Sequence, residues 1–358
     1  MFATKNTVIV PEIHGEQSST PINFGGIPNL ELESGTTGAP GHIIQQDGSK
    51  FDLQFGRASL SNDLGPTTGG YTKNVIIGTT QYKVHIFTTS GTFITNENLT
   101  ADILLVAGGG GGGGGYQSPG GGGGGAGGVL YNSTSNHNKD NSSITITQGT
   151  YSVTIGDGGL GGIGDGGSIT RLATSGGNTS FGTTYVAIGG GRGGAYSNQN
   201  AENGGSGGGG SFGSAIGSGT TGQGNSGGTA TTDSSQAGAG GGGAREAGQN
   251  GAPNNHGGNG GAGIEFDITG EFKMYAAGGG GGAGYDAGPG NRTGGMPGSY
   301  TAGYGGKSNE VGDCRGGHAI NGSGSGGGGA GGPVGTIDQS EQTGGDGGSG
   351  IVIIRYQI

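Results

Sequence analysis

The sequence has little charge and almost none of the residues that build disulfides. Charged residues make up 11 % of its 358 residues, tryptophan is absent, and Cys314 is its one cysteine, so an internal disulfide is excluded. A net charge of −10 argues against a nucleic-acid partner. No apolar stretch is long enough for a membrane-spanning helix, and residues 1–19 lack the basic and apolar regions of a secretory signal. We therefore expect no membrane insertion and no secretory signal peptide.

Glycine is abundant, with 103 residues that lie mostly in runs. A glycine run buries no apolar side chain and loses much conformational entropy on folding, so one interpretation is a flexible linker. Glycine and proline together reach the range that is typical of low-complexity disorder. Strand-like segments rich in β-branched residues alternate with the runs, however, and this alternation favours an ordered structure.

Residues 101–128 illustrate how strand signals and glycine runs are combined. The apolar segment at 103–106 (ILLV) leads into eight glycines at 108–115, and six more follow at 120–125 after a polar turn. A chain in polyproline-II geometry has three residues per turn and no internal hydrogen bonds, so each ordered run must bond sideways to other runs. We predict a polyglycine-II bundle on this basis. Its rods are expected mainly at residues 107–128, 189–263 and 277–350.

Short strands are predicted between these rods, and no α-helix of useful length is expected. From residue 75 on, about ten to twelve strand signals are separated by turns that contain glycine or asparagine. The expected strands lie at residues 75–77, 81–88, 92–95, 101–107, 128–131, 143–147, 151–155, 178–181, 185–188, 264–268, 271–276 and 351–356. This number predicts an all-β fold with a jelly-roll-like β-sandwich.

The first 75 residues differ from the rest of the chain. They are polar and rich in turns, with short strand signals at 7–11 and 51–55. We predict an extended N-terminal arm at residues 1–75 that attaches the protein to a partner. Residues 76–358 then form the glycine-rich sandwich and bundle. The alternative is a small β-subdomain that folds onto the main body.

The sequence provides no pattern that is typical of a catalytic or metal site. Its histidines are scattered without the spacing of a zinc motif, and His85 lies in an apolar strand, where a structural role is expected. Cys314 and His318 could be drawn as nucleophile and base, but a lone cysteine in a polar loop is usually inert. Matches to GxGxxG arise by chance in a chain so rich in glycine, and none lies in a βαβ unit. We expect no enzyme activity, no cofactor and no metal.

Several segments together resemble a known type of glycine-rich domain. They are YKVHIFTTSGTF at 82–93, ADILLVAGGGGG at 101–112, SITITQGTYSVTIGDGG at 143–159, GGNTSFG at 176–182 and GGSGIVIIRY at 347–356. Their order resembles the glycine-rich domains of phage and other viral tail-fibre or virion-surface proteins. It is also similar to the glycine-sandwich adhesins of phages and to the glycine-rich region of anaplastic lymphoma kinase. The resemblance covers residues 82–356 and implies a β-sandwich with an inserted polyglycine-II bundle.

Polar loops between the glycine runs carry the residues that we predict to bind a receptor. Loops on rigid scaffolds often carry recognition, and tyrosine rings beside planar polar groups suit contact with sugars or with outer-membrane proteins. The candidate receptor-binding residues are Tyr285, Asp286, Asn291, Arg292, Tyr300, Tyr304, Arg245 and His256. The alternative is that these loops only cap the ends of the rods.

These features lead us to expect a virion-surface or tail-fibre structural protein that acts as a non-catalytic adhesin for a host receptor. Its expected partners are other virion or fibre proteins, bound through residues 1–75, and a glycan or outer-membrane protein of the host surface. A homotrimer and a location on the virion surface or outside the cell belong to the same expectation. The alternatives are a purely structural decoration of a capsid or fibre, an extracellular filament or matrix protein and, more remotely, an ice-binding protein.

Overall fold

The computed structural model describes residues 67–164, 168–196, 199–232, 236–285, 292–308, 314–332 and 342–358, together with the backbone of three short strands nearer the N-terminus. The chain divides into two units, Met1–Leu64 and Gly65–Ile358. In the first unit, β1 (Glu31–Leu32), β2 (His42–Ile44) and β3 (Lys50–Asp52) form an antiparallel sheet in that order. β3 overlaps the predicted strand at 51–55, whereas the predicted strand at 7–11 lies outside the described residues.

The second unit is built on two antiparallel sheets. The larger sheet has six strands in the order β10–β8–β18–β6–β5, with β9 beside β8. These strands are β5 (Tyr71–Ile77), β6 (Thr80–Phe87), β8 (Leu99–Val106), β9 (Val129–Tyr131), β10 (Ile144–Ile146) and β18 (Ile351–Gln357). The second sheet has the order β15–β14–β11–β7–β4. Its strands are β4 (Thr67–Thr68), β7 (Gly91–Thr95), β11 (Gly149–Thr154), β14 (Thr179–Phe181) and β15 (Tyr185–Ala187).

Two further hairpins complete the strands of the second unit. They are β12 (Ile163–Gly164) with β13 (Ile169–Arg171), and β16 (Ile264–Phe266) with β17 (Lys273–Tyr275). The described residues contain no helix, so the predicted all-β fold is confirmed. The second unit begins at Gly65 and therefore includes β4 and most of β5, which the sequence analysis assigned to the N-terminal arm.

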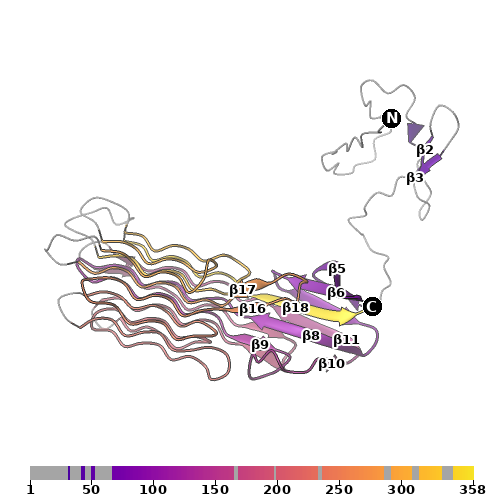
Figure 1. The fold of residues 1–358 in the computed structure, drawn as a ribbon, viewed down its shortest axis with the longest axis horizontal. Helices are drawn as coiled ribbons and strands as arrows, with labels where there is room; N and C mark the ends of the chain where they lie inside the picture. Colours follow the sequence, from indigo (N-terminus) through magenta and orange to yellow (C-terminus); the bar gives the residue numbers. More distant parts are fainter. Residues whose placement is uncertain are drawn as a thin grey trace. The chain divides into compact units, whose positions relative to one another are not determined.

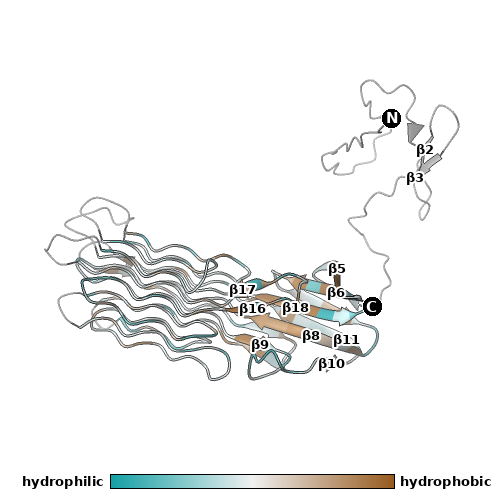
Figure 2. Cartoon of the chain, viewed as in Figure 1, coloured by the Kyte–Doolittle hydropathy of each residue, from teal (hydrophilic) through white to brown (hydrophobic). Residues whose placement is uncertain are grey.

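Side chains of β8 point alternately to two hydrophobic cores on opposite faces of the larger sheet. Ile103 and Leu105 face a core that the second sheet closes with Phe93, Val153 and other residues. Leu104 and Val106 face the other core, which includes residues of the β16–β17 hairpin. Because successive side chains of a strand point to opposite faces, a continuous apolar run such as that of β8 is typical of a strand buried on both sides. Figure 2 shows the hydrophobic residues concentrated in strands such as β8.

His85 on β6 connects the two sheets, in agreement with the structural role expected for it. Its Nδ1–H donates to the carbonyl oxygen of Gly69 at 2.7 Å, and its Nε2 accepts from the Thr67 hydroxyl at 3.0 Å. The Thr67 hydroxyl also bonds to the phenol of Tyr356 on β18. Burial of the imidazole lowers the pKa of His85, so the neutral ring is the form that suits this network.

The glycine runs lie side by side and extend from one end of the sheets (Figure 1). Along residues 108–113, successive N–H groups donate in turn to three neighbouring runs, and the cycle then repeats. Their acceptors, in order, are the carbonyls of Gly177, Gly348, Gly125, Thr174, Gly345 and Gly122. The backbone therefore bonds sideways with a three-residue period, and the runs satisfy the donors and acceptors of one another.

Some runs are surrounded by other runs on all sides, and we call these the inner runs. They comprise residues 107–115, 120–128, 206–210, 237–243, 276–284 and 324–332. Many glycines of these runs leave no room for a side chain, since a Cβ added to Gly112 would lie 2.0 Å from the carbonyl oxygen of Gly328. The equivalent atom on Gly122 would lie 1.9 Å from the oxygen of Gly209. Close approach of backbones is thus what glycine provides at these positions.

The remaining runs lie at the perimeter, and we call them the outer runs. Many of them carry a larger side chain at every third position, with glycine or another small residue between. Examples are the positions 157, 160 and 163, the positions 256 and 259, and the positions 343, 346 and 349. Because the hydrogen bonds repeat every three residues, this spacing puts one row of side chains on one side of each run.

Candidate functional site

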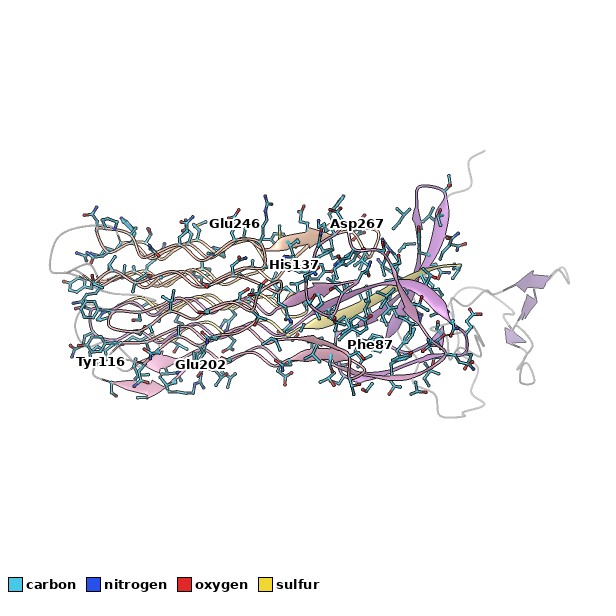
Figure 3. The ribbon with its side chains drawn as sticks, turned by 90° about the horizontal axis from the view of Figure 1, so that it is seen from below. Phe87, Tyr116, His137, Glu202, Glu246 and Asp267 are labelled. Carbon is cyan, nitrogen blue, oxygen red and sulfur yellow. The ribbon has the colours of Figure 1, made fainter. Side chains whose placement is uncertain are left out.

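The glycine runs turn back at the end farthest from the sheets. Tyr116 lies at this end in Figure 3, whereas the core residue Phe87 lies among the strands at the other end of the unit. We call the turns that gather around Tyr116 the distal end. It comprises the turns at residues 116–119, 211–214 and 252–256, together with Tyr196, Tyr285 and Arg292, because contacts between these residues connect them.

Three aromatic rings form a stacked row at the distal end. The rings of Tyr116 and Tyr196 are nearly parallel, at 13°, with centroids 4.4 Å apart. Phe212 continues the row on the other side of Tyr196, with centroids 6.2 Å apart and an angle of 16°. All three side chains are partly exposed. Stacking of this type adds to the stabilisation from burial and restricts the rotamers of the rings.

Tyr285 and Arg292 form a second pair beside this row. The N–H of Tyr285 donates to the carbonyl oxygen of Ser118 at 2.8 Å, so Tyr285 lies next to the turn that carries Tyr116. The guanidinium carbon of Arg292 lies 4.6 Å from the centroid of the Tyr285 ring, within the range of a cation–π interaction. Arg292 is buried, with 7 % of its surface exposed. The distal end therefore combines flat rings with one fixed cationic side chain.

His256 is at the distal end, and its side chain contacts the backbone of the next outer run. The Nδ1 atom accepts the N–H of Thr293 at 3.3 Å and lies 3.0 Å from the Thr293 hydroxyl. An Nδ1 that accepts from an N–H is unprotonated, so the proton of the neutral ring is assigned to Nε2. This contact connects two runs, as expected for a loop that only caps the ends of the rods.

Three other predicted residues lie away from the distal end. Tyr300 is in the turn at 299–302, close to Tyr275 of β17; burial and, to a smaller extent, Tyr300 raise the pKa of Tyr275 to about 12. Tyr304 lies within an outer run with its ring over Gly317. Arg245 lies beside Glu246, which Figure 3 places nearer to the strands than Tyr116. Asp286 and Asn291 lie outside the described residues.

The structure thus brings together Tyr285, Arg292 and His256 from the predicted set, and adds aromatic residues that the sequence analysis did not select. The omitted residues are Tyr116, Tyr196 and Phe212. A signal for them exists in the sequence, because Tyr116, Tyr196, Phe212 and Tyr285 each follow directly after a run of small residues. Their mutual contacts are between turns far apart in the chain, and only the folded arrangement of the runs reveals them.

A match to a known family covers most of the second unit. Residues 88–357 match the family model of the glycine-rich domain. The chain belongs to the glycine-rich domain family. The glycine-rich domain begins just after β6 and includes the distal end, whereas β4, β5 and β6 precede it. The comparison with curated proteins finds no match.

The distal end holds aromatic rings and a guanidinium. Groups of these kinds are able to make stacking contacts and hydrogen bonds. Across the residues that the structure describes in this glycine-rich domain and its flanks, no three His, Cys, Asp or Glu side chains gather as a metal ion would need. Nor does the described part of the chain include a helix that is long and apolar enough to cross a membrane.

Proposed function

We propose that the glycine runs are a polyglycine-II bundle, and that this bundle is a stiff support for a receptor-binding surface at its distal end. The observation that carries the proposal is the gathering of Tyr116, Tyr196, Phe212 and the Tyr285–Arg292 pair from separate turns at one end of the runs. The three-residue hydrogen-bond period of the runs supports the bundle, since polyproline-II geometry has three residues per turn.

Aromatic residues held in this way suit recognition. Rigid tyrosines provide a large contact area at a low cost in conformational entropy, and arginine and tyrosine are enriched at binding hot spots. A backbone lattice that fixes the turns in advance lowers the entropic cost of binding further. The distal end therefore provides both the contact groups and their preorganisation.

In this proposal the protein is a virion-surface or tail-fibre component and acts as a non-catalytic adhesin. Residues 1–75 attach it to other virion or fibre proteins, directly or as part of a homotrimer, and the distal end binds a glycan or an outer-membrane protein of the host. The resemblance of residues 82–356 to viral glycine-rich domains supports this context.

The test is binding of the full-length protein to a panel of bacterial cells. The distal variant Tyr116→Ala/Tyr196→Ala/Tyr285→Ala is compared with the matched variant Tyr300→Ala/Tyr304→Ala, in which two tyrosines away from the distal end are removed. Their side chains are 71 % and 58 % exposed, so their loss leaves packing largely intact. We expect saturable binding that only the distal variant loses. Equal binding by all three proteins, or loss in the matched variant alone, would refute the distal site.

A structural role is the second candidate, and the mutual stacking of the rings favours it. Tyr116, Tyr196 and Phe212 cover one another in part, as residues that only cap the ends of runs would do. In that case no cell would bind any of the proteins, and the distal variant would unfold at a lower temperature than the parent. Thermal unfolding measured beside the binding assay separates the two functions.

A further inference from the structure

One arrangement of hydrogen bonds recurs between neighbouring outer runs. A side-chain acceptor of one residue binds the N–H of a residue in the next run, and the N–H that follows the acceptor in the chain donates back to the carbonyl of that same residue. For Asn259, Oδ1 accepts the N–H of Met296 at 2.8 Å, and the N–H of Gly260 donates to the Met296 carbonyl at 2.9 Å. We call this pair of bonds a backbone clamp.

Backbone clamps occur in several places at the perimeter. The others join Asn200 to Ala215, Asn203 to Ser218, Asn250 to Thr229, His256 to Thr293, His318 to Asp346 and Asn321 to Ser349. An outer run has no further run on its solvent side, so its outward N–H groups need another acceptor. Side chains of asparagine and histidine supply that acceptor.

The clamps coincide with a reactive dipeptide. The sequence contains Asn–Gly steps only at residues 203–204, 250–251, 259–260 and 321–322. Each of these steps forms a backbone clamp. Asn–Gly is the dipeptide most prone to deamidation, because a glycine without Cβ lets its backbone nitrogen approach the preceding side chain.

Deamidation at such a step has a defined geometry. The backbone nitrogen of Gly260 attacks Cγ of Asn259, a new C–N bond forms, and the side-chain amide leaves as ammonia with the proton of the Gly260 N–H. Water then opens the cyclic imide at one of its two carbonyls and gives aspartate or isoaspartate. In the clamp this N–H is bonded to the Met296 carbonyl, and Oδ1 is held by the Met296 N–H. The nitrogen is therefore directed at the neighbouring run and away from Cγ.

We propose that the Asn–Gly clamps are deamidation sites that the folded perimeter protects, and that isoaspartate formed after local opening prevents the clamp from closing. Aspartate retains an acceptor oxygen at the position of Oδ1 and leaves the main chain unchanged. Isoaspartate adds one methylene to the main chain and removes one from the side chain. This change displaces both bonds of the clamp, whose geometry depends on the three-residue register.

Ageing of the full-length protein tests the protection. The protein is incubated at mildly alkaline pH in buffer and in concentrated urea, and each Asn–Gly site is followed by peptide mass spectrometry and enzymatic isoaspartate methylation. If the fold protects the four sites, deamidation in buffer requires local opening of the perimeter. We therefore expect the deamidation rate at these sites to be about tenfold or more lower in buffer than in urea. Free peptides of the same sequences correct for the direct effect of urea on the rate. Equal corrected rates would overturn the proposal.

A single substitution tests the role of the clamp itself. Met296→Pro removes the backbone N–H that donates a hydrogen bond to Oδ1 of Asn259. Proline suits an extended run because its φ is near that of polyproline II. In a variant whose circular dichroism matches the parent, deamidation at Asn259 should be faster, while Asn203 and Asn321 serve as unchanged internal sites. An unchanged rate at Asn259 would show that the clamp is not the source of protection.

The effect of the two products is tested by hydrogen exchange. Asn259→Asp should leave the Met296 amide protected. The protein that contains isoaspartate at position 259 is isolated after ageing in urea and refolding. In this protein the Met296 amide should exchange about tenfold faster or more. Equal protection of the Met296 amide in the two proteins would contradict the second half of the proposal.

Discussion

The sheets and the glycine runs of the second unit are stabilised in opposite ways. In the sheets, side chains such as Ile103, Leu104 and Leu105 are fully buried, and removal of their apolar surface from water stabilises the fold. In the inner runs almost no side chains exist, and the backbones are held by hydrogen bonds to neighbouring runs. A sheet core can therefore adapt to a side chain of similar volume, whereas an inner run has no space in which to adapt.

The largest expected effect comes from an alanine in an inner run. Gly112→Ala places a Cβ 2.0 Å from the Gly328 oxygen, and neither backbone can move without breaking its other bonds. We expect a loss on the order of 5 kcal/mol in the free energy of unfolding, or failure to fold. Urea unfolding followed by circular dichroism measures it.

The matched control for this change is Gly213→Ala in a distal turn. A Cβ there would meet nothing within 4 Å, although the φ of +74° disfavours any residue but glycine. The expected loss is about 1–2 kcal/mol from this backbone conformation alone. If both variants lost the same stability, close approach of the inner runs would not be the decisive factor.

Removal of a buried side chain from the sheets comes next in size. Leu105→Ala leaves a cavity between the two sheets and should lower the free energy of unfolding by about 3 kcal/mol. Leu160→Ala on an outer run, where the side chain is 50 % exposed, should change it by about 0.5 kcal/mol or less. Thermal and urea unfolding of both variants compare the two regions directly. A larger loss for Leu160→Ala would reverse the comparison.

A smaller expected effect is a pH dependence of the free energy of unfolding that arises in the sheets. Burial lowers the pKa of His85 in the folded protein, so the neutral ring contributes stability above the unfolded pKa, near 6.5, and this contribution is lost as the pH falls through the lowered folded pKa. His85→Gln keeps a donor and an acceptor without a titration in this range. We expect its free energy of unfolding to fall less between pH 7 and acid than that of the parent. Parallel pH profiles for the two proteins would exclude His85 as the titrating group.

The smallest effect concerns one contact at the perimeter of the runs. His256→Asn replaces the imidazole nitrogen that accepts in this clamp by an amide oxygen, the acceptor that Asn259 provides in its own clamp. This change should leave the free energy of unfolding nearly unchanged. His256→Ala leaves the Thr293 N–H without this acceptor and should cost about 1 kcal/mol. Amide exchange at Thr293 reports the same difference locally. Similar exchange in the alanine and asparagine variants would mean that the clamp adds nothing there.

Much of the fold could be predicted from the sequence. The expected strands overlap β5 to β11 and β14 to β18, because alternating or continuous apolar segments between glycine turns identify them. β1, β2, β4, β12 and β13 were missed. β4 consists of Thr67 and Thr68, which carry no hydrophobic pattern, and it is defined by its pairing with β7. The jelly-roll connectivity stays a prediction.

The candidate site was predictable only in part. Tyr285 and Arg292 were selected together because they belong to one polar segment of the sequence, and the structure places the guanidinium over the ring. Tyr300 and Tyr304 were also selected because they are close to Tyr285 in the sequence. In the structure, however, they lie away from the distal end. Sequence distance is a poor guide here, since a run reverses direction at every turn.

The sequence by itself determined where most strands form and where glycine runs begin and end, because hydrophobic periodicity and glycine are both visible in one dimension. Only the tertiary structure decided which runs are inner, which turns meet at the distal end and which asparagines form clamps. The physical reason is that glycine has no side chain through which one run could select another. Neighbours in the lattice are chosen by backbone hydrogen bonds, which are the same for every glycine, and by the lengths and turns of the whole chain.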